Sequence, residues 1–234
     1  MTTRTPEELE EKLHYHFKNK ELLITALTHS SYANESKTPT LYNERLEFLG
    51  DSVLSVVVAN YLFHHSTRPE GELSRMRASL VSEDALFQFA QEIDLGSYLR
   101  LGRGEELGGG RCRPSVVSDA FEAVCGAIYL DQGSALVTEF ILKTLHTNCR
   151  EPSDLLHSLN PKGLLQEYAQ AHFGKAPEYK ILGVSGPAHN PCYEVEVLVN
   201  GELLAKGVAA KRKLAEQAAA KAAMEVLSAQ RKNN

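Results

Sequence analysis

The sequence lacks the features of membrane, secreted and zinc-binding proteins. None of its apolar runs approaches the roughly 20 residues that a membrane span needs. Its first residues, MTTRTPEELEEKL, are acidic and polar, unlike a signal peptide. Its four cysteines lie far apart and form no CxxC pair, so they predict buried free thiols rather than a zinc site or a disulfide framework. We therefore expect a cytoplasmic protein without a membrane partner.

Common phosphate-binding and metalloprotease motifs are absent as well. Residues 102–111, GRGEELGGGR, are rich in glycine but have neither GxGxxG spacing nor a GK[ST] ending, and no strand pattern precedes them. The adjacent His64 and His65 belong to no HExxH motif. We interpret residues 102–111 as a flexible loop in which Arg111, together with Arg113, could touch a nucleic acid.

Charge is unevenly distributed along the 234 residues, whose formal net charge is -5. Residues 1–157 contain 15 Lys and Arg against 23 Asp and Glu, whereas residues 158–234 contain 10 against 7. Between the two parts, residues 151–163 read EPSDLLHSLNPKG, and their prolines, glycine and small polar residues are typical of a linker. The sequence thus predicts two domains with different tasks.

The first domain is predicted to be helical throughout. Apolar residues recur at the spacing of an amphipathic helix in six segments, which are 6–13, 21–32, 41–65, 71–93, 115–130 and 134–146. VSEDALFQ resembles a capping box that begins at Ser82, so residues 71–93 are either two helices or one bent helix. We expect an all-α domain over residues 5–134, with helix extending to about residue 150.

Acidic residues line one face of the third helical segment. In NERLEFLGDSVL, residues 43–54, the side chains of Glu44, Glu47 and Asp51 are three and four positions apart, which stacks their carboxylates along one side of a helix. Like charges at this spacing repel one another, and Arg45 alone offers a nearby cation. The arrangement therefore indicates a site rather than a solvated helix surface.

A second acidic pair lies in SDAFEAVCGAIYLD, residues 118–131. Ser118 resembles a helix N-cap, and Asp119 and Glu122 follow at i, i+3 spacing on an otherwise apolar helix. Asp119 alone has a simpler explanation, because an acidic residue in the first turn favours the helix dipole. Four or five carboxylates that converge from two helices need a cation to stay ionised, and oxygen ligands favour Mg²⁺ or Mn²⁺ over Zn²⁺.

Together these segments resemble the bacterial ribonuclease III family, whose members cut double-stranded RNA. NERLEFLGDSVL, PEGELSRMRASLVSE and SDAFEAVCGAIYLD match the family's three motif blocks in order, and the resemblance covers nearly the whole chain. It implies three metal ligands, which are Glu47, Asp119 and Glu122. It also implies an essential catalytic Asp51 and supporting acidic residues Glu44 and Glu70. We predict that Asp51 and Glu122 lie closest to the chemistry, with one or two Mg²⁺ ions at the site and Mn²⁺ as a substitute.

The second domain shows the pattern of a helix, three short strands and a helix. The segments are PKGLLQEYAQAHF, PEYKILGVSG, CYEVEVLVN, ELLAKGVAA and KRKLAEQAAAKAAMEVL. This order resembles the double-stranded RNA-binding domain, which recognises duplex shape across two minor grooves. We expect a linker at residues 151–160 and then, at 161–230, a small α+β domain with the order α-β-β-β-α.

The resemblance carries three candidate RNA-binding elements. They are Gln166, Glu167 and Gln170 on the first helix, His189 in the GPAH loop between strands, and Lys211, Arg212 and Lys213 at the start of the last helix. A helix N-terminus favours anions, and three adjacent cations there would form a phosphate clamp. The helix dipole alone would disfavour cations at that end, so phosphate binding explains them better than a solvated surface does.

The resemblance implies a Mg²⁺-dependent endonuclease that leaves 5′-phosphate and 3′-hydroxyl ends and processes ribosomal RNA precursors and structured messenger RNAs. Because the strands of a duplex run antiparallel, we expect a two-fold homodimer with one site for each strand. Phe48, Leu49 and Val53 are candidates for its interface. The alternative is a non-catalytic duplex-RNA-binding or ribosome-assembly protein on the same scaffold, although the intact carboxylates argue against it.

Overall fold

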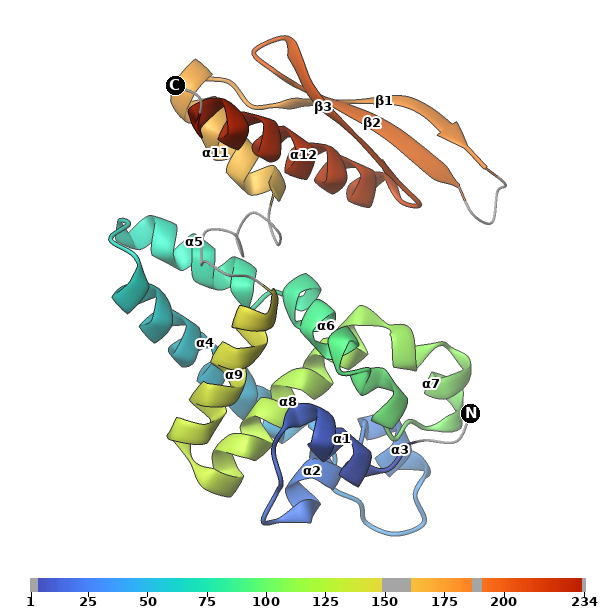
Figure 1. The fold of residues 1–234 in the computed structure, drawn as a ribbon. Helices are drawn as coiled ribbons and strands as arrows, with labels where there is room; N and C mark the ends of the chain where they lie inside the picture. Colours follow the sequence, from blue (N-terminus) through green and yellow to red (C-terminus); the bar gives the residue numbers. More distant parts are fainter. Residues whose placement is uncertain (1–3, 149–160, 187–190, 233–234) are drawn as a thin grey trace. The chain divides into compact units, whose positions relative to one another are not determined.

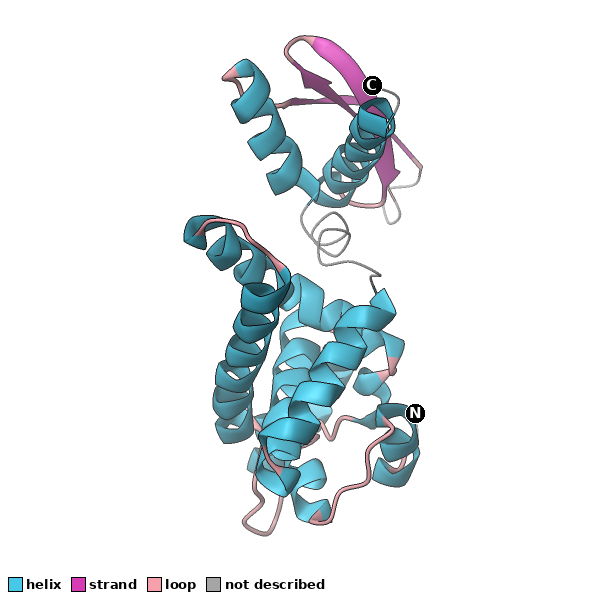
Figure 2. Cartoon of the chain, turned by 60° about the vertical axis from the view of Figure 1, so that its left-hand side comes forward, coloured by secondary structure: helices cyan, strands magenta, loops and turns pink. Residues whose placement is uncertain are grey.

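The computed structural model describes residues 4–148, 161–186 and 191–232, and the chain divides into two compact units, Met1–Pro152 and Ser153–Asn234. Figure 1 and Figure 2 show that the first unit is built from helices and that the strands lie in the second. The predicted fold class, an all-α domain followed by a small α+β domain, is confirmed.

The helices of the first unit pack around helix α8. In chain order they are α1 (Pro6–Leu13), α2 (Lys20–Ala26), α3 (Ser30–Glu35), α4 (Glu44–His65), α5 (Glu70–Leu80), α6 (Glu83–Glu92), α7 (Arg103–Leu107), α8 (Pro114–Gln132) and α9 (Ser134–Asn148), with short 3-10 helices η1 (Leu95–Tyr98) and η2 (Gly110–Cys112). Helix α8 is buried along most of its length, and Figure 1 shows it in the middle of the unit. Its apolar sequence is therefore that of a core helix.

Helices α4 and α8 cross with their backbones in direct contact. A Cβ atom on Gly50 of α4 would stand 1.8 Å from the carbonyl oxygen of Glu122, and one on Gly126 of α8 would stand 2.3 Å from the carbonyl oxygen of Leu46. Glycine at these two positions permits an approach that any side chain would block. The crossing holds the two acidic helical segments of the sequence against each other.

Residues 71–93 form two helices, α5 and α6, rather than one bent helix. The Oγ atom of Ser82 accepts a hydrogen bond from the backbone N–H of Ala85, as expected of an N-cap. The same hydroxyl donates to the carbonyl oxygen of Ser79 at the end of α5. Ser82 therefore satisfies backbone groups on both sides of the break.

Residues 21–32, predicted as one helix, are divided into α2 and α3. Between the two helices, Thr28 forms a parallel β-bridge with Arg100. The backbone N–H of Arg100 donates to the carbonyl oxygen of Leu27, and the N–H of His29 donates to the carbonyl oxygen of Arg100. This pairing with a distant segment interrupts the helix.

Helix α8 begins before Ser118, the residue predicted to be its N-cap. Pro114 is its first residue and Arg113 is the N-cap, in keeping with the preference of proline for the first turn. Ser118 lies inside the helix, where its Oγ donates to the carbonyl oxygen of Ser115 (3.0 Å). The expectation that Ser118 caps the helix is therefore wrong. Asp119 lies beyond the first turn, so the helix dipole does not account for it.

Residues 102–111 are ordered into α7 and η2, which corrects their interpretation as a flexible loop. Arg111 pairs with Glu106 (2.7 Å) and donates to the carbonyl oxygens of Gly96 and Leu99. The segment is thus held by ion pairing and backbone contacts rather than by apolar packing. A second ion pair joins Arg113 and Glu105 at 2.5 Å.

The C-terminal end of α8 holds the loop that follows α1. Asp131 accepts hydrogen bonds from the hydroxyl of Tyr15 (2.8 Å) and from the backbone N–H groups of Lys18 (2.9 Å) and Asn19 (2.8 Å). Partial burial acts to raise the pKa of Asp131, but these hydrogen bonds outweigh it and lower that pKa. The carboxylate is therefore charged at neutral pH and fixes the loop to the helix.

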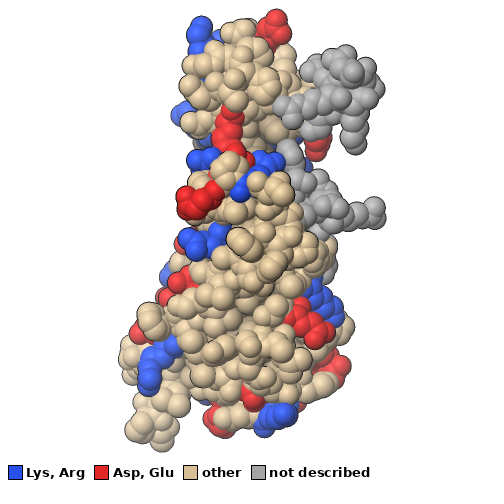
Figure 3. Space-filling view, turned by 90° about the vertical axis from the view of Figure 1, so that its left-hand side faces the viewer, with Lys and Arg blue, Asp and Glu red and all other residues tan. Residues whose placement is uncertain are grey.

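One side of α4 carries exposed apolar residues. Phe48, Val56 and Phe63 are 78%, 68% and 72% exposed, and their spacing places them on one face of the helix. Figure 3 looks onto the side of the first unit where α4, α5 and α9 lie in Figure 1, and it shows broad areas without charged side chains. By length and composition alone, α4 would be able to cross a membrane, contrary to the expectation from apolar runs, although a core helix of a soluble protein meets the same test.

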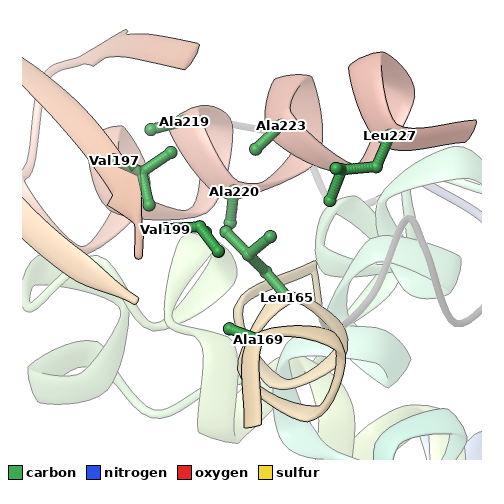
Figure 4. Close-up of a cluster of buried hydrophobic side chains, with 8 residues drawn as sticks. All are labelled: Leu165, Ala169, Val197, Val199, Ala219, Ala220, Ala223 and Leu227. Atoms are coloured by element: carbon green, nitrogen blue, oxygen red, sulfur yellow. The ribbon is translucent and has the colours of Figure 1, made fainter. Parts of the chain in front are cut away.

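The second unit is a three-stranded antiparallel sheet packed against two helices. Its elements are α11 (Pro161–Phe173), β1 (Glu178–Ser185), β2 (Cys192–Val199), β3 (Glu202–Ala209) and α12 (Arg212–Lys232), with β2 in the middle of the sheet. Figure 4 shows Leu165 of α11, Val197 of β2 and the alanines of α12 pointing into one core. A Cβ atom on Gly207 would stand 2.2 Å from the backbone nitrogen of Ala219, so α12 lies close against the sheet.

The cysteines of the described residues are free thiols. Cys125 is buried as predicted, whereas Cys112 is exposed and Cys192 is partly buried. Cys149 lies outside the described residues. The expectation of buried thiols therefore holds for Cys125 and is wrong for Cys112.

Candidate active site and RNA-binding surface

Three carboxylates from two helices meet at the crossing of α4 and α8. Oxygen atoms of Glu47 on α4 and of Asp119 and Glu122 on α8 lie within 4.8 Å of one another, and all three side chains are partly buried. We refer to these three residues as the carboxylate cluster. Glu47 lies one helical turn before Gly50, and Gly50 contacts the backbone of Glu122. The backbone contact therefore sets the distance between the carboxylates of the two helices.

Burial and mutual repulsion oppose ionisation of the carboxylate cluster. Burial raises the pKa of Glu122 to about 8, and the negative charges of Asp51, Asp119 and Glu47 add to this shift. Burial also raises the pKa of Glu47, and Asp119 and Glu44 act in the same direction. Among the described residues, the three members of the cluster are the His, Cys, Asp or Glu side chains whose ligand atoms lie close enough together to hold a metal ion. A divalent cation would relieve the repulsion.

Sequence reasoning missed two neighbours of Asp119, Glu83 and His29. Burial is the main reason that the pKa of Asp119 is raised, the charge of Glu83 adds to the shift, and His29 opposes it. Glu83 lies in the first turn of α6, directly after Ser82, and His29 is the N-cap of α3. The capping box at Ser82 signals a helix start, but no local pattern places that start near Asp119.

The other predicted acidic residues lie around the carboxylate cluster. Asp51 and Glu44 are exposed on α4, and the charge of each raises the pKa of Glu47. Glu70 is exposed in the first turn of α5, and its Oε1 accepts a hydrogen bond from the hydroxyl of Ser74 (2.8 Å). Among the described residues, Glu70 is therefore a surface acid rather than a member of the cluster.

The predicted RNA-binding residues of α11 lie on its exposed side. Gln166, Glu167 and Gln170 are all exposed, whereas Leu165 and Ala169 are buried in the core. The side-chain amide of Gln170 also donates to the carbonyl oxygen of Gly174, directly after the helix (3.3 Å). His189 lies outside the described residues, so its placement stays a prediction.

The three predicted cations at the start of α12 are exposed as well. Between Lys211 and Lys213, the Nε atom of Arg212 donates to Oε1 of Glu216 (2.8 Å), while Oε2 of Glu216 accepts from Nζ of Lys162 (2.6 Å). The hydrogen bond from Lys162 lowers the pKa of Glu216, and Arg212 contributes in the same direction. This contact uses only Nε of Arg212, so the terminal N–H groups of its guanidinium can donate to a phosphate.

Each of the two units matches a known protein family. Residues 19–149 match the family model described as ribonuclease-III-like, and residues 161–227 match the double-stranded RNA binding motif. A carboxylate-bearing helical unit followed by this motif defines an endonuclease that acts on double-stranded RNA. The chain is 48% identical over 226 residues to ribonuclease 3 of Nitratiruptor sp., covering 95% of this chain and 97% of that protein. It therefore belongs to the ribonuclease III family.

Other relatives agree with this assignment. The chain is 43% identical to ribonuclease 3 of Listeria welshimeri over 224 residues, covering 95% of this chain and 97% of that protein. The nuclease domain of ribonuclease III from Campylobacter jejuni matches the structure with a TM-score of 0.58 and 44% identity, covering 62% of this chain and 99% of that domain. The family makes the chain an endoribonuclease rather than the non-catalytic binding protein considered as an alternative.

Proposed function

We propose that the chain hydrolyses phosphodiester bonds of double-stranded RNA with Mg²⁺, for which Mn²⁺ can substitute, and leaves 5′-phosphate and 3′-hydroxyl ends. The observation that carries the proposal is the carboxylate cluster, whose oxygens lie within 4.8 Å of one another. Its donors are all oxygen atoms, which hard cations such as Mg²⁺ prefer. The raised pKa values of all three carboxylates are those expected of a site whose charge a cation has to balance.

In this proposal the carboxylate cluster holds the ion, and Asp51 and Glu122 lie closest to the scissile phosphate. A bound divalent ion would supply an activated water and neutralise charge on the attacking and leaving oxygens. Asp51 is exposed beside the cluster, so its carboxylate can orient a water or accept a proton. Glu44 adds negative charge at the edge of the cluster. A supporting role of Glu70 stays a prediction from the family resemblance.

The second unit would bind the duplex by its shape. The exposed polar side chains of α11 suit contacts in a minor groove, and the cations at the start of α12 suit phosphates. His189 would add a further contact. We propose that the substrates include ribosomal RNA precursors and structured messenger RNAs, and that the protein acts on them in the cytoplasm.

We further propose a two-fold homodimer in which α4 supplies the contact. The exposed apolar face formed by Phe48, Val56 and Phe63 supports it, because large exposed apolar patches mark interaction surfaces. Leu49 and Val53, also expected at the interface, are partly buried. The Campylobacter jejuni structure is reported for flexibility in the region involved in dimer formation of its nuclease domain. A dimer contact would also explain the apolar surface of α4 without a membrane partner.

Replacing Glu122 tests the proposed metal site. Glu122→Gln keeps the size of the side chain but removes a charged ligand, so cleavage of a duplex RNA in Mg²⁺ should fall by about 100-fold or more, while duplex affinity measured in EDTA stays unchanged. Glu139→Gln, an exposed residue of α9, serves as the matched control and should cut at the wild-type rate.

The same assay without a metal tests the cation itself. The wild-type protein should not cut in EDTA and should regain cleavage when Mg²⁺ or Mn²⁺ is added. Rapid cleavage by Glu122→Gln, or by the wild-type protein in EDTA, would contradict the proposal. Unchanged duplex affinity of Glu122→Gln, and of the wild-type protein in EDTA, would show that the second unit still binds RNA.

A further inference from the structure

An open pocket of about 680 Å³ lies in the first unit, where α1, α2, α3 and α7 meet near the N-terminus in Figure 1. Its apolar floor is formed by Ile24, Leu27 and Leu101, and its cations are Arg4, Arg100 and Arg111. None of its lining residues belongs to the carboxylate cluster or to the second unit. Its volume falls within the range of small-ligand pockets, roughly 300–1,000 Å³.

Arg100 brings an uncompensated positive charge to this pocket. Its Nη1 donates to the hydroxyl of Thr28 (3.2 Å), its Nη2 donates to the hydroxyl of Tyr32 (3.0 Å), and its guanidinium lies 4.3 Å from the centre of the Tyr32 ring. Within the part of the chain that the structure describes, its hydrogen-bond partners are these neutral hydroxyls rather than carboxylates. The remaining guanidinium N–H groups and the hydroxyl proton of Tyr32 can still donate to an anion.

The charges around the pocket leave an excess of cations. Two ion pairs and one longer contact surround it: Arg111 with Glu106 at 2.7 Å, Arg4 with Asp94 at 2.9 Å, and Lys12 with Asp94 at 3.8 Å. Among the residues that line the pocket, the three cations Arg4, Arg100 and Arg111 outnumber the single carboxylate, Glu106. This excess matches the charge of about -1.5 to -2 that a phosphate monoester carries at pH 7.

Tyr98 lies in the wall of the pocket, next to two cations. Its side chain is 2% exposed, its hydroxyl interacts with Arg4, and the guanidinium of Arg4 lies 5.9 Å from the centre of its ring. The ring of Tyr98 also lies within cation–π range of Lys12, at 5.2 Å.

We propose that this pocket binds a small phosphorylated ligand with a flat apolar body, of the size of a nucleoside monophosphate. The phosphate would accept hydrogen bonds from Arg100 and Tyr32, because a guanidinium fork suits phosphate geometry. The apolar body would lie on Ile24, which is partly exposed, and on the edge of Leu101. No residue of the carboxylate cluster takes part, so binding at this pocket is independent of the proposed nuclease chemistry.

Titration of the 234-residue chain with AMP in EDTA tests the proposal without any metal at the carboxylate cluster. Methyl NMR signals of Ile24, Leu27 and Leu101 should shift saturably with AMP, because these side chains line the pocket. Adenosine should bind about tenfold more weakly or worse, since it lacks the phosphate. Inorganic phosphate should shift the same signals less and at higher concentration. Absence of shifts at millimolar AMP, or equal binding of AMP and adenosine, would overturn the proposal.

Variants tie the binding to the named side chains. Arg100→Gln removes the charge and should weaken AMP binding about tenfold or more, and Tyr32→Phe should weaken it several-fold. Arg103→Gln, an exposed arginine outside the lining, is the matched control and should bind as the wild type does. Thermal unfolding without ligand checks that each variant is folded. If Arg103→Gln lost as much affinity as Arg100→Gln, binding would be nonspecific and the proposal wrong; if Arg100→Gln were unfolded, Tyr32→Phe would decide alone.

Discussion

At the scale of single residues, Glu122 links the charge of the candidate active site to protein stability. Its carboxyl group has an ordinary pKa of 4.5 and a folded-state pKa of about 8, because it is buried beside Asp51, Asp119 and Glu47. Between these values the folded chain binds a proton that the unfolded chain lacks. The contribution of Glu122 to stability is therefore fully present below about pH 4.5 and is lost as the pH rises through about 8.

We predict that the metal-free protein loses thermal stability between about pH 5 and about pH 8, and that Glu122→Gln loses less over the same range. The measurement is thermal unfolding in EDTA across this range for both proteins, so that other titrating groups cancel in the comparison. The unfolding temperatures should diverge with rising pH, with the variant higher. Adding Mg²⁺ near pH 8 should stabilise the wild type more than the variant. Parallel curves for the two proteins would refute the prediction.

Local patterns account for part of the site, and tertiary contacts account for the rest. The spacing of Asp119 and Glu122 on an apolar helix can be recognised in the sequence, whereas the role of Ser118 cannot be assigned correctly without knowing that the helix begins at Pro114. The proximity of His29 and Glu83 to Asp119 comes from packing between separate helices. A pattern within one helix carries no information about such neighbours.

At the scale of elements, the crossing of α4 and α8 should tolerate no side chain at Gly50. A Cβ atom there would stand 1.8 Å from the carbonyl oxygen of Glu122, so Gly50→Ala has to push the helices apart. We predict a loss of about 1–3 kcal/mol or more in the free energy of unfolding, measured in urea. Binding of Mn²⁺ should weaken as well, because the separation of Glu47 from Glu122 changes.

Gly71→Ala is the matched control for this prediction. Gly71 lies in the first turn of α5, and a Cβ atom there would have no neighbour within 4 Å. Alanine is a better helix former than glycine, so this variant should be unchanged or more stable by up to about 1 kcal/mol. If Gly50→Ala behaved like Gly71→Ala, the proposed close contact between the helices would be wrong.

Helix α12 offers a second test at this scale. Glu216 holds Arg212 through its Nε atom, and the neutral amide oxygen of a glutamine is a weaker acceptor, so Glu216→Gln should weaken duplex binding a few-fold by loosening the guanidinium. If Glu216 acts through Arg212, the double variant with Arg212→Ala should bind no more weakly than Arg212→Ala alone. Lys213→Ala should instead add its loss to that of Glu216→Gln. Duplex affinity is measured at fixed salt for both double variants. If the losses added for Glu216 with Arg212 as fully as for Glu216 with Lys213, Glu216 would not act by positioning Arg212.

The sequence predicts the order of elements well in the second unit but less well in parts of the first. Strand β2 alternates apolar and polar residues and buries every second one from Val195 to Val199, so it can be recognised locally. The break between α2 and α3 depends on the pairing of Thr28 with Arg100, which are 72 residues apart. Helix α7 is held in place by ion pairs such as that of Arg111 with Glu106. The many glycines of residues 102–111 suggest a flexible loop and give no sign of these ion pairs.

At the scale of the whole molecule, the apolar face of α4 should decide the oligomeric state. Val56→Glu places a charge in the middle of that face, so the protein should become monomeric by light scattering after gel filtration and lose most of its double-strand cleavage. Leu107→Glu is the matched control, because Leu107 is 80% exposed but lies on α7. A dimer that survived Val56→Glu, or a loss of the dimer in both variants, would exclude α4 as the specific contact.

The hydrogen bonds of Asp131 also determine how helix α8 can respond to insertions. Each residue added to an α-helix turns the following part by about 100° and advances it by about 1.5 Å. Asp131 binds Tyr15, Lys18 and Asn19 at one end of α8, while Asp119 and Glu122 lie nearer the other. A residue inserted between Glu122 and Asp131 would leave only one of these two regions in its proper orientation. The length of α8 between them is therefore as constrained as the acidic residues themselves.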